Sequence, residues 1–479
     1  MTEMTGFADD NTDSASVLSN DSLRFLPAQV GDTEELELYQ RGGFHPVHLG
    51  DFYDDCRYRI VHKLGAGGFS TVWLAYDSLL SGWVALKIVV ADKSPVVEEK
   101  AIMCHNIASQ CSDGRFIIYT RYFHIEGPNG RHLCLVLPPC GPSSYVLSHY
   151  LRSRTNPWLA RRAAFQAAKA IADLHSRGLC HGDVTPSNIV FRIRSLDHLD
   201  DQGIYRLFGE PRTGQLDTYS GDIPGPEAPR YIVGYLDFMS SEEDLLLDDI
   251  CLIDFDQAFL TSKPPKEVLE TPVGFLAPEV AVGKAASPAS DVWALGCTIL
   301  HIRSGSSPFS TLDVDCPANL MRCIVEYIGD MPTSWGEPLF DDDGQPTAEK
   351  RCGRPLRELS TGTKSLRQWI SEIWDQPMSL DGIQSTSTLP IIVDNESKPY
   401  PKCYGNKFWK PAAIRIDNTY LGGYCDKVDK IIESLPKISA HEADLLFDLL
   451  SKIFVYEPTK RLGMSDILAH PWFDLDHIV

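Results

Sequence analysis

The sequence predicts an α+β fold in which a small β-rich lobe is followed by a larger helical lobe. Two observations lead to this prediction. Residues 58–90 are rich in β-branched and aromatic side chains interrupted by glycines, which is typical of consecutive antiparallel strands. After Pro138 and Pro139 the apolar residues recur with helical spacing instead. With 479 residues, of which 43% are hydrophobic and 23% charged, the chain has enough apolar side chains for such a core.

Each element of the small lobe has its own local pattern. Apolar and polar residues alternate at the start of this region and then meet a glycine-rich turn, which favours a hairpin. A periodic stretch interrupts the strands, and a short apolar run precedes the two prolines. We expect strands over residues 58–64, 71–76, 83–90 and 133–137, and a helix over residues 96–108.

The larger lobe is read from helical periodicity and from helix-end signals. An alanine-rich stretch ends at Gly178, a good residue for a helix C-terminus. A Ser-Pro pair opens another apolar stretch. We expect helices over residues 158–176, 287–304 and 441–454, and one that begins near Ser465 and ends before Pro471.

Two acidic stretches hold most of the net charge of −21. Residues 1–40 contain nine acidic residues and one basic residue, and residues 195–250 contain thirteen and three. Blocks of like charge are usually solvated loops, which is the interpretation we favour. The alternative is that they attract or mimic a basic partner.

The predicted domains follow from these patterns. They are a disordered acidic tail over residues 1–40, a small lobe with an N-terminal extension over residues 41–137, and a large lobe over residues 138–479. The large lobe would contain the acidic spacer at about 195–250. Because loop-closure entropy grows only logarithmically, we expect that a short linker can replace this spacer without loss of folding.

Several classes of protein are disfavoured. No apolar run approaches the roughly 18 residues of a membrane span, and the N-terminus lacks the pattern of a signal peptide. No dense basic stripe indicates direct nucleic-acid binding. Thirteen cysteines without a CxxC pair favour a reducing intracellular compartment, the cytoplasm or the nucleus. We expect a monomer.

Six local motifs occur in order along the chain. The first, Gly65-Ala66-Gly67-Gly68, lies between two strands, and its backbone N–H groups could approach phosphates without obstruction. The second is Val84-Ala85-Leu86-Lys87 on the next strand, whose lysine needs a counter-charge. Glu98 and Glu99 both lie on the following helix, and we prefer Glu99 as the partner that holds Lys87 against phosphates. Taken singly, a hairpin turn and an exposed lysine would be the ordinary explanations.

The other motifs fall in the helical lobe. In His181-Gly182-Asp183 with Asn188, an aspartate can orient a hydroxyl while an asparagine five positions later ligates Mg²⁺. Asp254-Phe255-Asp256 offers a second metal ligand, Asp254. The last two motifs are Ala277-Pro278-Glu279, with Arg461 far downstream to pair with Glu279, and the segment Asp291-Val292-Trp293-Ala294-Leu295-Gly296.

In this order the motifs resemble a eukaryotic-type protein kinase from about Tyr58 to Phe473. More narrowly, the chain is similar to the SRPK-like kinases of the SR-protein kinase group, of which fungi carry many. That similarity lies in residues 42–51 (GGFHPVHLGD) and 68–77 (GFSTVWLAYD), and in the serine at the third glycine position of the loop. The 66 positions between Asn188 and Asp254, which hold the acidic spacer, are a further likeness.

The resemblance implies a bilobal protein kinase fold that uses ATP and Mg²⁺ to phosphorylate protein substrates, in Arg/Ser-rich segments. It implies that Asp183 is the catalytic aspartate, that Lys87 pairs with Glu99, and that Asn188 and Asp254 hold Mg²⁺. The implied nucleotide-binding residues are Leu64, Gly65, Gly67, Gly68, Val72, Ala85, Lys87, the gatekeeper Leu137, and Pro138 and Cys140 of the hinge.

Some positions depart from the family pattern. Gly182 replaces the arginine before the catalytic aspartate, and Thr185 replaces the lysine that would contact the γ-phosphate. Thr271 stands one position out of register with the substrate-loop threonine. An active serine/threonine protein kinase is the interpretation we favour. The alternatives are a pseudokinase scaffold that binds nucleotide or a partner without phosphotransfer, and an ATPase-like role, since a compact atypical kinase family also reads His-Gly-Asp-x-Thr.

Overall fold

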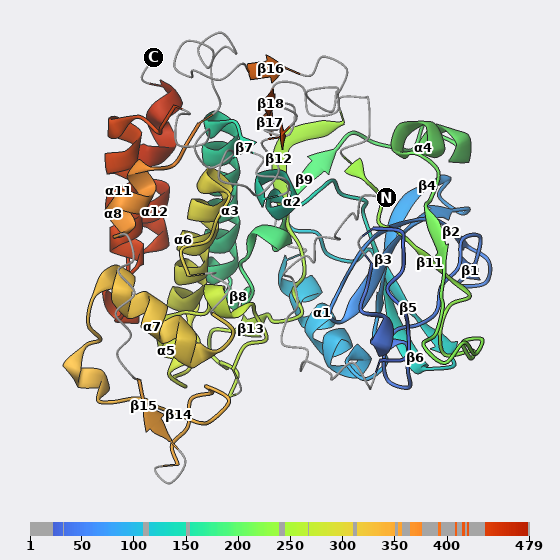
Figure 1. The fold of residues 1–479 in the computed structure, drawn as a ribbon, viewed down its shortest axis with the longest axis horizontal. Coiled ribbons are helices and arrows are strands. Elements are labelled where there is room, and N and C mark those ends of the chain that lie inside the picture. The colour runs from blue at the N-terminus through green and yellow to red at the C-terminus, as the bar shows by residue number, and fades with distance from the viewer. Residues whose placement is uncertain are drawn as a thin grey trace. The chain divides into compact units, whose positions relative to one another are not determined.

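The computed structural model groups the chain into two compact units, which we describe separately (Figure 1). The first contains Met1–Met103, Ile118–Cys140 and Ser195–Ser241, and the second contains Cys104–Ile117, Gly141–Arg194 and Glu242–Val479. The structure describes residues 23–31, 33–108, 115–149, 154–238, 245–266, 268–309, 314–349, 353–356, 365–375, 391–393, 408–409, 414–416, 419–420 and 436–477.

A six-stranded antiparallel sheet forms the centre of the first unit. The glycine-rich segment makes the hairpin between its second and third strands, as the sequence predicts. Two of its strands, β1 and β5, have no counterpart among the predicted elements. In spatial order the strands are β1 (Phe52–Tyr53), β2 (Tyr58–Gly67), β3 (Ser70–Asp77), β4 (Gly82–Val89), β6 (Gly130–Leu137) and β5 (Arg121–Gly127).

The two faces of this sheet carry different layers, because side chains alternate along each strand. On one face Val89 and Leu135 pack with Val97 of helix α1 (Ser94–Ala108). The other face carries the main core, and Trp73 and Leu86 are buried there. Val47 and Val233, from outside the sheet, belong to this second core. The segment before the first strand, through Val47, and the acidic spacer, through Val233, therefore both cover the sheet face opposite α1.

Residues Ser195–Ser241 of the spacer group with the first unit, whereas the spacer residues from Glu242 onward group with the second. The described elements of Ser195–Ser241 are α4 (Asp201–Phe208), β10 (Thr213–Gln215) and β11 (Tyr231–Val233), of which the last two pair as a hairpin. Asp200 caps α4 by accepting a hydrogen bond from the N–H of Gly203. Apolar residues inside the acidic stretch provide the buried surface, so the charge is confined to its outer side chains.

The N-terminal segment also contributes buried residues, although residues 1–40 were predicted to be a disordered tail. Residues 1–22 and 32 lie outside the described residues. From Leu23 onward the chain bridges to the spacer at Phe25 and Thr218, and a 3₁₀ helix, η2, covers Leu36–Leu38. We call the resulting cluster of both segments the flank core; its buried members are Phe25, Val30, Leu36, Tyr39, Phe44, Val90, Leu216, Ala228 and Ile232.

Two helices form the centre of the second unit. Helix α3 (Pro157–Ser176) buries a face of alanines, which allows close helix packing, and Asn156 caps its first turn. Helix α6 (Pro288–Ser304) is buried on nearly all sides and ends at Gly305 in the left-handed conformation. Helix α11 (Ala440–Ile453) packs against α6. The helices predicted here agree with the structure to within one residue at each end.

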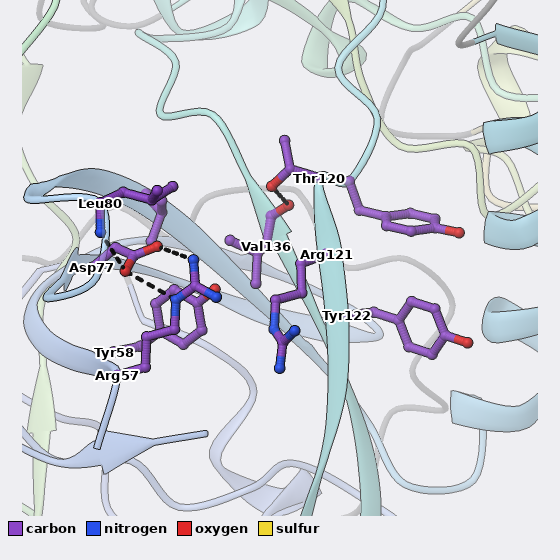
Figure 2. A pocket seen from close by; sticks show the side chains of 10 residues that line it. Arg57, Tyr58, Asp77, Leu80, Thr120, Arg121, Tyr122 and Val136 are labelled. Carbon is purple, nitrogen blue, oxygen red and sulfur yellow. Dashed lines mark hydrogen bonds and ion pairs between the residues drawn. The ribbon is translucent and has the colours of Figure 1, made fainter. Parts of the chain in front are cut away.

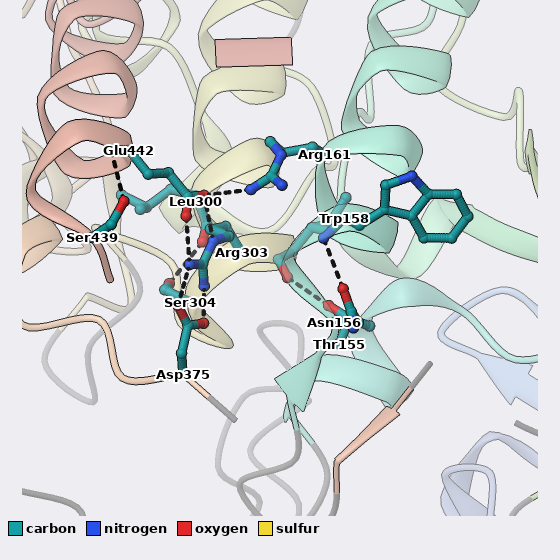
Figure 3. A network of polar contacts seen from close by, with 11 residues as sticks. Thr155, Asn156, Trp158, Arg161, Leu300, Arg303, Ser304, Asp375, Ser439 and Glu442 are labelled. Atoms are coloured by element: carbon teal, nitrogen blue, oxygen red, sulfur yellow. Dashed lines mark hydrogen bonds and ion pairs between the residues drawn. The ribbon is translucent and has the colours of Figure 1, made fainter. Parts of the chain in front are cut away.

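A buried charge network joins these helices (Figure 3). The Arg303 guanidinium of α6 donates to both carboxylate oxygens of Glu442, at 2.8 and 3.0 Å, and also to Asp375 at 2.8 Å. Arg161 of α3 donates to Glu442 at 3.1 Å. Three elements far apart in sequence are thereby tied at one carboxylate.

The other described elements of this unit are short. They are α2 (Ser144–His149), β7 (Arg154–Thr155), β8 (Leu179–Cys180), η4 (Pro186–Asn188), β9 (Ile189–Ile193), β12 (Leu246–Leu252), β13 (Phe259–Leu260), η6 (Val273–Phe275), α5 (Pro278–Ala281), α7 (Pro317–Ile328), η7 (Thr333–Trp335), β14 (Leu339–Phe340), β15 (Arg354–Pro355), α8 (Leu366–Ser371), β16 (Ile391–Val393), β17 (Phe408–Trp409), β18 (Ile414–Ile416), β19 (Thr419–Tyr420), η10 (Pro458–Lys460), α12 (Met464–Leu468) and η11 (Pro471–His477).

Candidate active site

Four predicted nucleotide-binding residues share one face of the sheet in the first unit. Strand register places Val72 opposite Lys87 and Ala85 opposite Leu137. Ala85 and Lys87 are two positions apart, so their side chains point to the same side, which is the side that α1 covers. Lys87 is only 7% exposed. This register is what an adenine site next to a phosphate-binding lysine requires.

The glycine-rich loop between β2 and β3 has open space around it. At Gly65, Gly67 and Gly68 an added Cβ would meet no atom of the protein within 4 Å. Packing of the chain therefore does not explain why these positions are glycines. A ligand that approaches the backbone closely would explain them, and phosphate oxygens bound by backbone N–H groups are such a ligand. Leu64, which precedes the loop, is half-buried.

The predicted residues of the hinge and of helix α1 differ in how they are placed. Pro138 keeps its carbonyl oxygen, and the Cys140 thiol donates a weak hydrogen bond to it at 3.8 Å. On α1, Glu98 is the half-buried glutamate, and its carboxylate lies 3.0 Å from Nε2 of His124. Glu99, our preferred partner for Lys87, lies on the exposed side of the helix. The Lys87–Glu99 pair therefore stays a prediction.

In the second unit, Asp291 of α6 holds the loop that begins at His181. Its carboxylate accepts hydrogen bonds from the backbone N–H groups of His181, at 2.8 Å, and Gly182, at 2.9 Å. His175 Nε2 lies 2.9 Å from the same carboxylate. This last contact was not predicted. His175, Cys180 and Asp291 lie close enough together to suggest a metal site, but the carboxylate is already used by these donors, and we assign it a bracing role.

His181 connects this loop to the Asp254 segment. Its Nε2 donates to the carbonyl oxygen of Ile253 at 3.0 Å, while its Nδ1 accepts from the N–H of Asp183 at 3.2 Å. The ring packs on Phe255 with centroids 4.9 Å apart. Burial lowers the pKa of His181, so the imidazole is neutral near pH 7. One ring thus sets the backbone on both sides of the site.

Asp183 is fixed at both carboxylate oxygens. Asn188 Nδ2 donates to one of them at 2.6 Å and to the Asp183 carbonyl oxygen at 3.0 Å. Thr271 Oγ1 donates to the other carboxylate oxygen. A carboxylate held this way has a defined orientation, which is what a group that positions a substrate hydroxyl needs.

The predicted metal ligands also come together in this unit. The N–H of Ile253 donates to the carbonyl oxygen of Asn188 at 3.0 Å, which brings Asp254 close to the loop. Asp254 has a φ of 62°, a left-handed conformation that is rare outside glycine and recurs at functional sites. The Asn188 amide nitrogen is occupied by Asp183, so a metal would bind the amide oxygen. A carboxylate and an amide oxygen are ligands that suit Mg²⁺.

The departures from the family pattern have clear structural settings. Gly182 has a φ of 79°, and a Cβ there would lie 2.4 Å from the carbonyl oxygen of Gln257. Thr185, which stands where the family has a lysine, is 3% exposed and therefore lies in a closely packed position. The predicted pair of Arg461 and Glu279 is formed by two hydrogen bonds at 3.0 and 2.9 Å, with both side chains buried.

One cavity in the first unit lies away from these residues. It has a volume of about 470 Å³ (Figure 2). Val84 and Val136 line it, and both point away from the face that carries Ala85 and Leu137. Arg57 at its edge is held by Asp77 at 2.7 and 2.9 Å. We do not assign this cavity to nucleotide binding.

Comparison with known proteins identifies the family. The model described as "Protein kinase domain" matches residues 58–223 and 238–473, which is the greater part of the chain. The chain therefore belongs to the protein kinase family, and the predicted bilobal kinase fold, with a β-rich N-terminal sheet followed by a helical region, is confirmed. None of the helices in the described ranges combines the length and apolar character that a membrane span requires.

Distant relatives are SR-protein kinases. The serine/threonine-protein kinase SRPK of Physarum polycephalum is 27% identical over 365 residues, which cover 70% of this chain and 82% of that protein. Protein kinase dsk1 of Schizosaccharomyces pombe is 34% identical over 179 residues, or 35% of this chain and 32% of the relative. Human SRSF protein kinase 3 is 32% identical over 168 residues, which cover 33% of this chain and 29% of that protein. This chain thus matches about a third of the length of the last two relatives.

Proposed function

We propose that this protein is an active serine/threonine kinase that transfers the γ-phosphoryl group of ATP to protein hydroxyl groups. The observation that carries the proposal is the orientation of Asp183, whose two carboxylate oxygens accept hydrogen bonds from Asn188 and Thr271. Asp183 would orient the acceptor hydroxyl and accept its proton. Asn188 and Asp254 would hold Mg²⁺, which neutralises charge on the phosphates when bound.

The nucleotide would be held by the residues predicted for it. Val72 and Ala85 would contact adenine, Lys87 with Glu99 would hold the α- and β-phosphates, and backbone N–H groups of the glycine-rich loop would cover them. Leu64, Leu137, Pro138 and Cys140 would complete the adenine site. The register of β3, β4 and β6 supports this assignment, because it puts Val72, Ala85, Lys87 and Leu137 on one face.

We further propose Arg/Ser-rich protein segments as the substrate class. The similarity to SRPK and to a relative named as an SRSF protein kinase supports this choice. The nine cysteines within the described ranges are free thiols, which supports a reducing compartment, the cytoplasm or the nucleus. That the chain acts as a monomer, binds no nucleic acid directly and is of the fungal type also stays part of this proposal.

A pseudokinase scaffold is the second candidate, and Thr185 favours it. The lysine expected at this position stabilises the transferring phosphoryl group, and a buried threonine carries no charge to do so. A protein with this loss could bind Mg·ATP without transferring phosphate.

Turnover of ATP with and without an Arg/Ser-repeat peptide tests the two candidates. The active-kinase proposal predicts phosphopeptide that depends on Mg²⁺ and is lost in Asp183→Asn, while ATP binding measured by calorimetry is retained. Binding of ATP by the wild type without phosphate transfer to any protein or peptide would favour the scaffold. Transfer to an Ala/Ser-repeat peptide as efficiently as to the Arg/Ser-repeat would contradict the proposed substrate class.

A further inference from the structure

A buried lysine stands immediately before the glycine-rich loop. Lys63 of β2 is 0% exposed, and its Nζ donates to a carboxylate oxygen of Glu34 from the N-terminal segment. The Tyr39 hydroxyl donates to the other oxygen of Glu34. Burial lowers the pKa of Lys63, and Glu34 opposes that effect. A buried ammonium group of this kind is stable only with its counter-charge present.

Lys63 also contacts strand β3 and the spacer. The Lys63 Nζ lies 5.0 Å from the ring centroid of Trp73 and 5.6 Å from that of Tyr235. The N–H of Leu236 donates to the Lys63 carbonyl oxygen at 2.7 Å. Lys63 is therefore joined to the N-terminal segment by its side chain and to the spacer by its backbone.

The far end of the loop meets the same two segments. Phe69 packs against the flank core, which is built from the N-terminal segment and the spacer around Val90. The Phe69 carbonyl oxygen accepts a hydrogen bond from the N–H of Val90 at 2.9 Å. Between these two ends lie the three glycines with open space around them, so the position of the loop depends on how its ends are held.

We propose that Glu34 is a positioning residue for ATP: through Lys63 it fixes the start of the glycine-rich loop, while the flank core fixes its end at Phe69. This inference rests on the proposed function, because it assumes that the loop covers the phosphates of ATP. An N-terminal segment and a spacer that are remote in sequence would thus control the affinity for nucleotide without touching it.

The test compares Glu34→Gln with Asp201→Asn in the full chain. Each variant removes one carboxylate that pairs with β2; Asp201 of the spacer pairs with Arg59 at 2.8 Å, four residues before Lys63. For Glu34→Gln we expect a KM for ATP raised about fivefold or more, with kcat little changed, as for ordinary coupling between separate sites. We also expect faster amide hydrogen exchange in residues 64–70. Asp201→Asn should match the wild type in both measurements.

The exchange measurement separates the two hypotheses. If the wild type does not bind ATP, the proposed function fails, and the exchange rates of residues 64–70 in the nucleotide-free protein alone decide the role of Glu34. If Glu34→Gln does not fold, Tyr39→Phe replaces it, since it removes one hydrogen bond to Glu34 and keeps the ring. If amide exchange in residues 64–70 is as slow in the Glu34 variant, or in Tyr39→Phe where that replaces it, as in Asp201→Asn, the proposal is overturned.

Discussion

Thr271 donates a hydrogen bond to the carboxylate of Asp183, although it stands one position out of register with the substrate-loop threonine of the family. The 3₁₀ helix η6 at Val273–Phe275 lies between Thr271 and the Ala277-Pro278-Glu279 motif. From this position in the sequence, the Thr271 hydroxyl therefore still reaches the Asp183 carboxylate.

We expect that Thr271→Ala lowers kcat by about tenfold or more, because the Asp183 carboxylate loses a donor that helps to orient it. The KM for ATP should change little. Thr271→Ser keeps a hydroxyl at the same place and should retain most of the activity. Steady-state kinetics with a peptide substrate measure both variants. Equal kcat values for Thr271→Ala and the wild type would show that the Thr271 hydroxyl is not needed to orient Asp183.

Mg·ATP should raise the melting temperature of the wild type, since a ligand that binds the native state stabilises it. Lys87→Met should remove most of that increase because it deletes the buried ammonium group and keeps the aliphatic stem. Without ATP, the two proteins should melt at nearly the same temperature. Lys460→Met, a change at an exposed lysine, is the control and should keep the full increase. An undiminished increase in Lys87→Met would refute the assignment of the nucleotide face.

Gly182 should not tolerate a side chain. Gly182→Ala should lower the free energy of unfolding by at least about 1–2 kcal/mol for the left-handed backbone alone, with a further cost from the Gln257 carbonyl oxygen 2.4 Å away. Gly221→Ala is the control, because Gly221 has a φ of 78° and no atom within 4 Å of an added Cβ. Thermal or urea unfolding gives the difference between them. If both variants lose the same stability, the close contact with Gln257 plays no part.

Removal of the spacer should not spare folding, contrary to the expectation from loop entropy. Ile232 is 1% exposed in the flank core, so Ile232→Ala should cost about 2–5 kcal/mol. Ile223→Ala is the same chemical change at a spacer residue that is 93% exposed, and it should cost almost nothing. Urea unfolding measures both. Equal stabilities of the two variants would mean that the spacer does not contribute to the fold.

The stability should depend on pH through Glu442. Burial alone would raise the pKa of Glu442, but its bonds to Arg303 and Arg161 outweigh that effect and hold the pKa below its usual 4.5. A carboxylate with a lowered pKa stabilises the folded state above its unfolded pKa, and this contribution is lost as the pH falls through the folded-state pKa. The stabilisation by Glu442 should therefore be complete at pH 7 and decline below about pH 4.5.

Glu442→Gln measures this effect directly. At pH 7 it should lower the free energy of unfolding by about 3 kcal/mol, because it takes the main counter-charge from the buried Arg303. The difference from the wild type should shrink as the solution is acidified. Asp444→Asn on the same helix breaks an exposed pair with Arg367 and should have little effect at any pH. If the difference in the free energy of unfolding between Glu442→Gln and the wild type stays constant down to pH 3, the pH dependence is not due to Glu442.

The parts of the fold that follow local rules could be predicted from the sequence. Helices α3, α6 and α11 have long apolar periodicities and end signals, and the structure places them within one residue of the predictions. The residues proposed for catalysis could be picked out because those of the His181-Gly182-Asp183 motif are contiguous in the sequence. Asp183, Asn188 and Asp254 come together in the second unit. Asn188 donates to Asp183, and its carbonyl oxygen accepts from Ile253, the residue before Asp254.

The flank core could not be predicted, because no local sequence pattern indicates it. Phe25 and Leu36 lie in a stretch whose composition is acidic and polar, and Ile232 lies in another, about two hundred positions away. The average charge of each stretch concealed a few apolar side chains that become a core only when the two meet. In the same way, the need for glycine at position 182 depends on the backbone of Gln257, which the sequence does not relate to it.

The assignment of the spacer to the first unit also changes what counts as a separable piece of this protein. The chain leaves that unit after Met103, returns at Ile118, leaves again after Cys140 and returns for Ser195–Ser241. A fragment that stops at the hinge would therefore lack Tyr235 and Val233, and with them part of the cover of its own sheet. No uninterrupted stretch of polypeptide encodes the complete unit, so a gene fragment for it would have to join residues from three separate stretches of the chain.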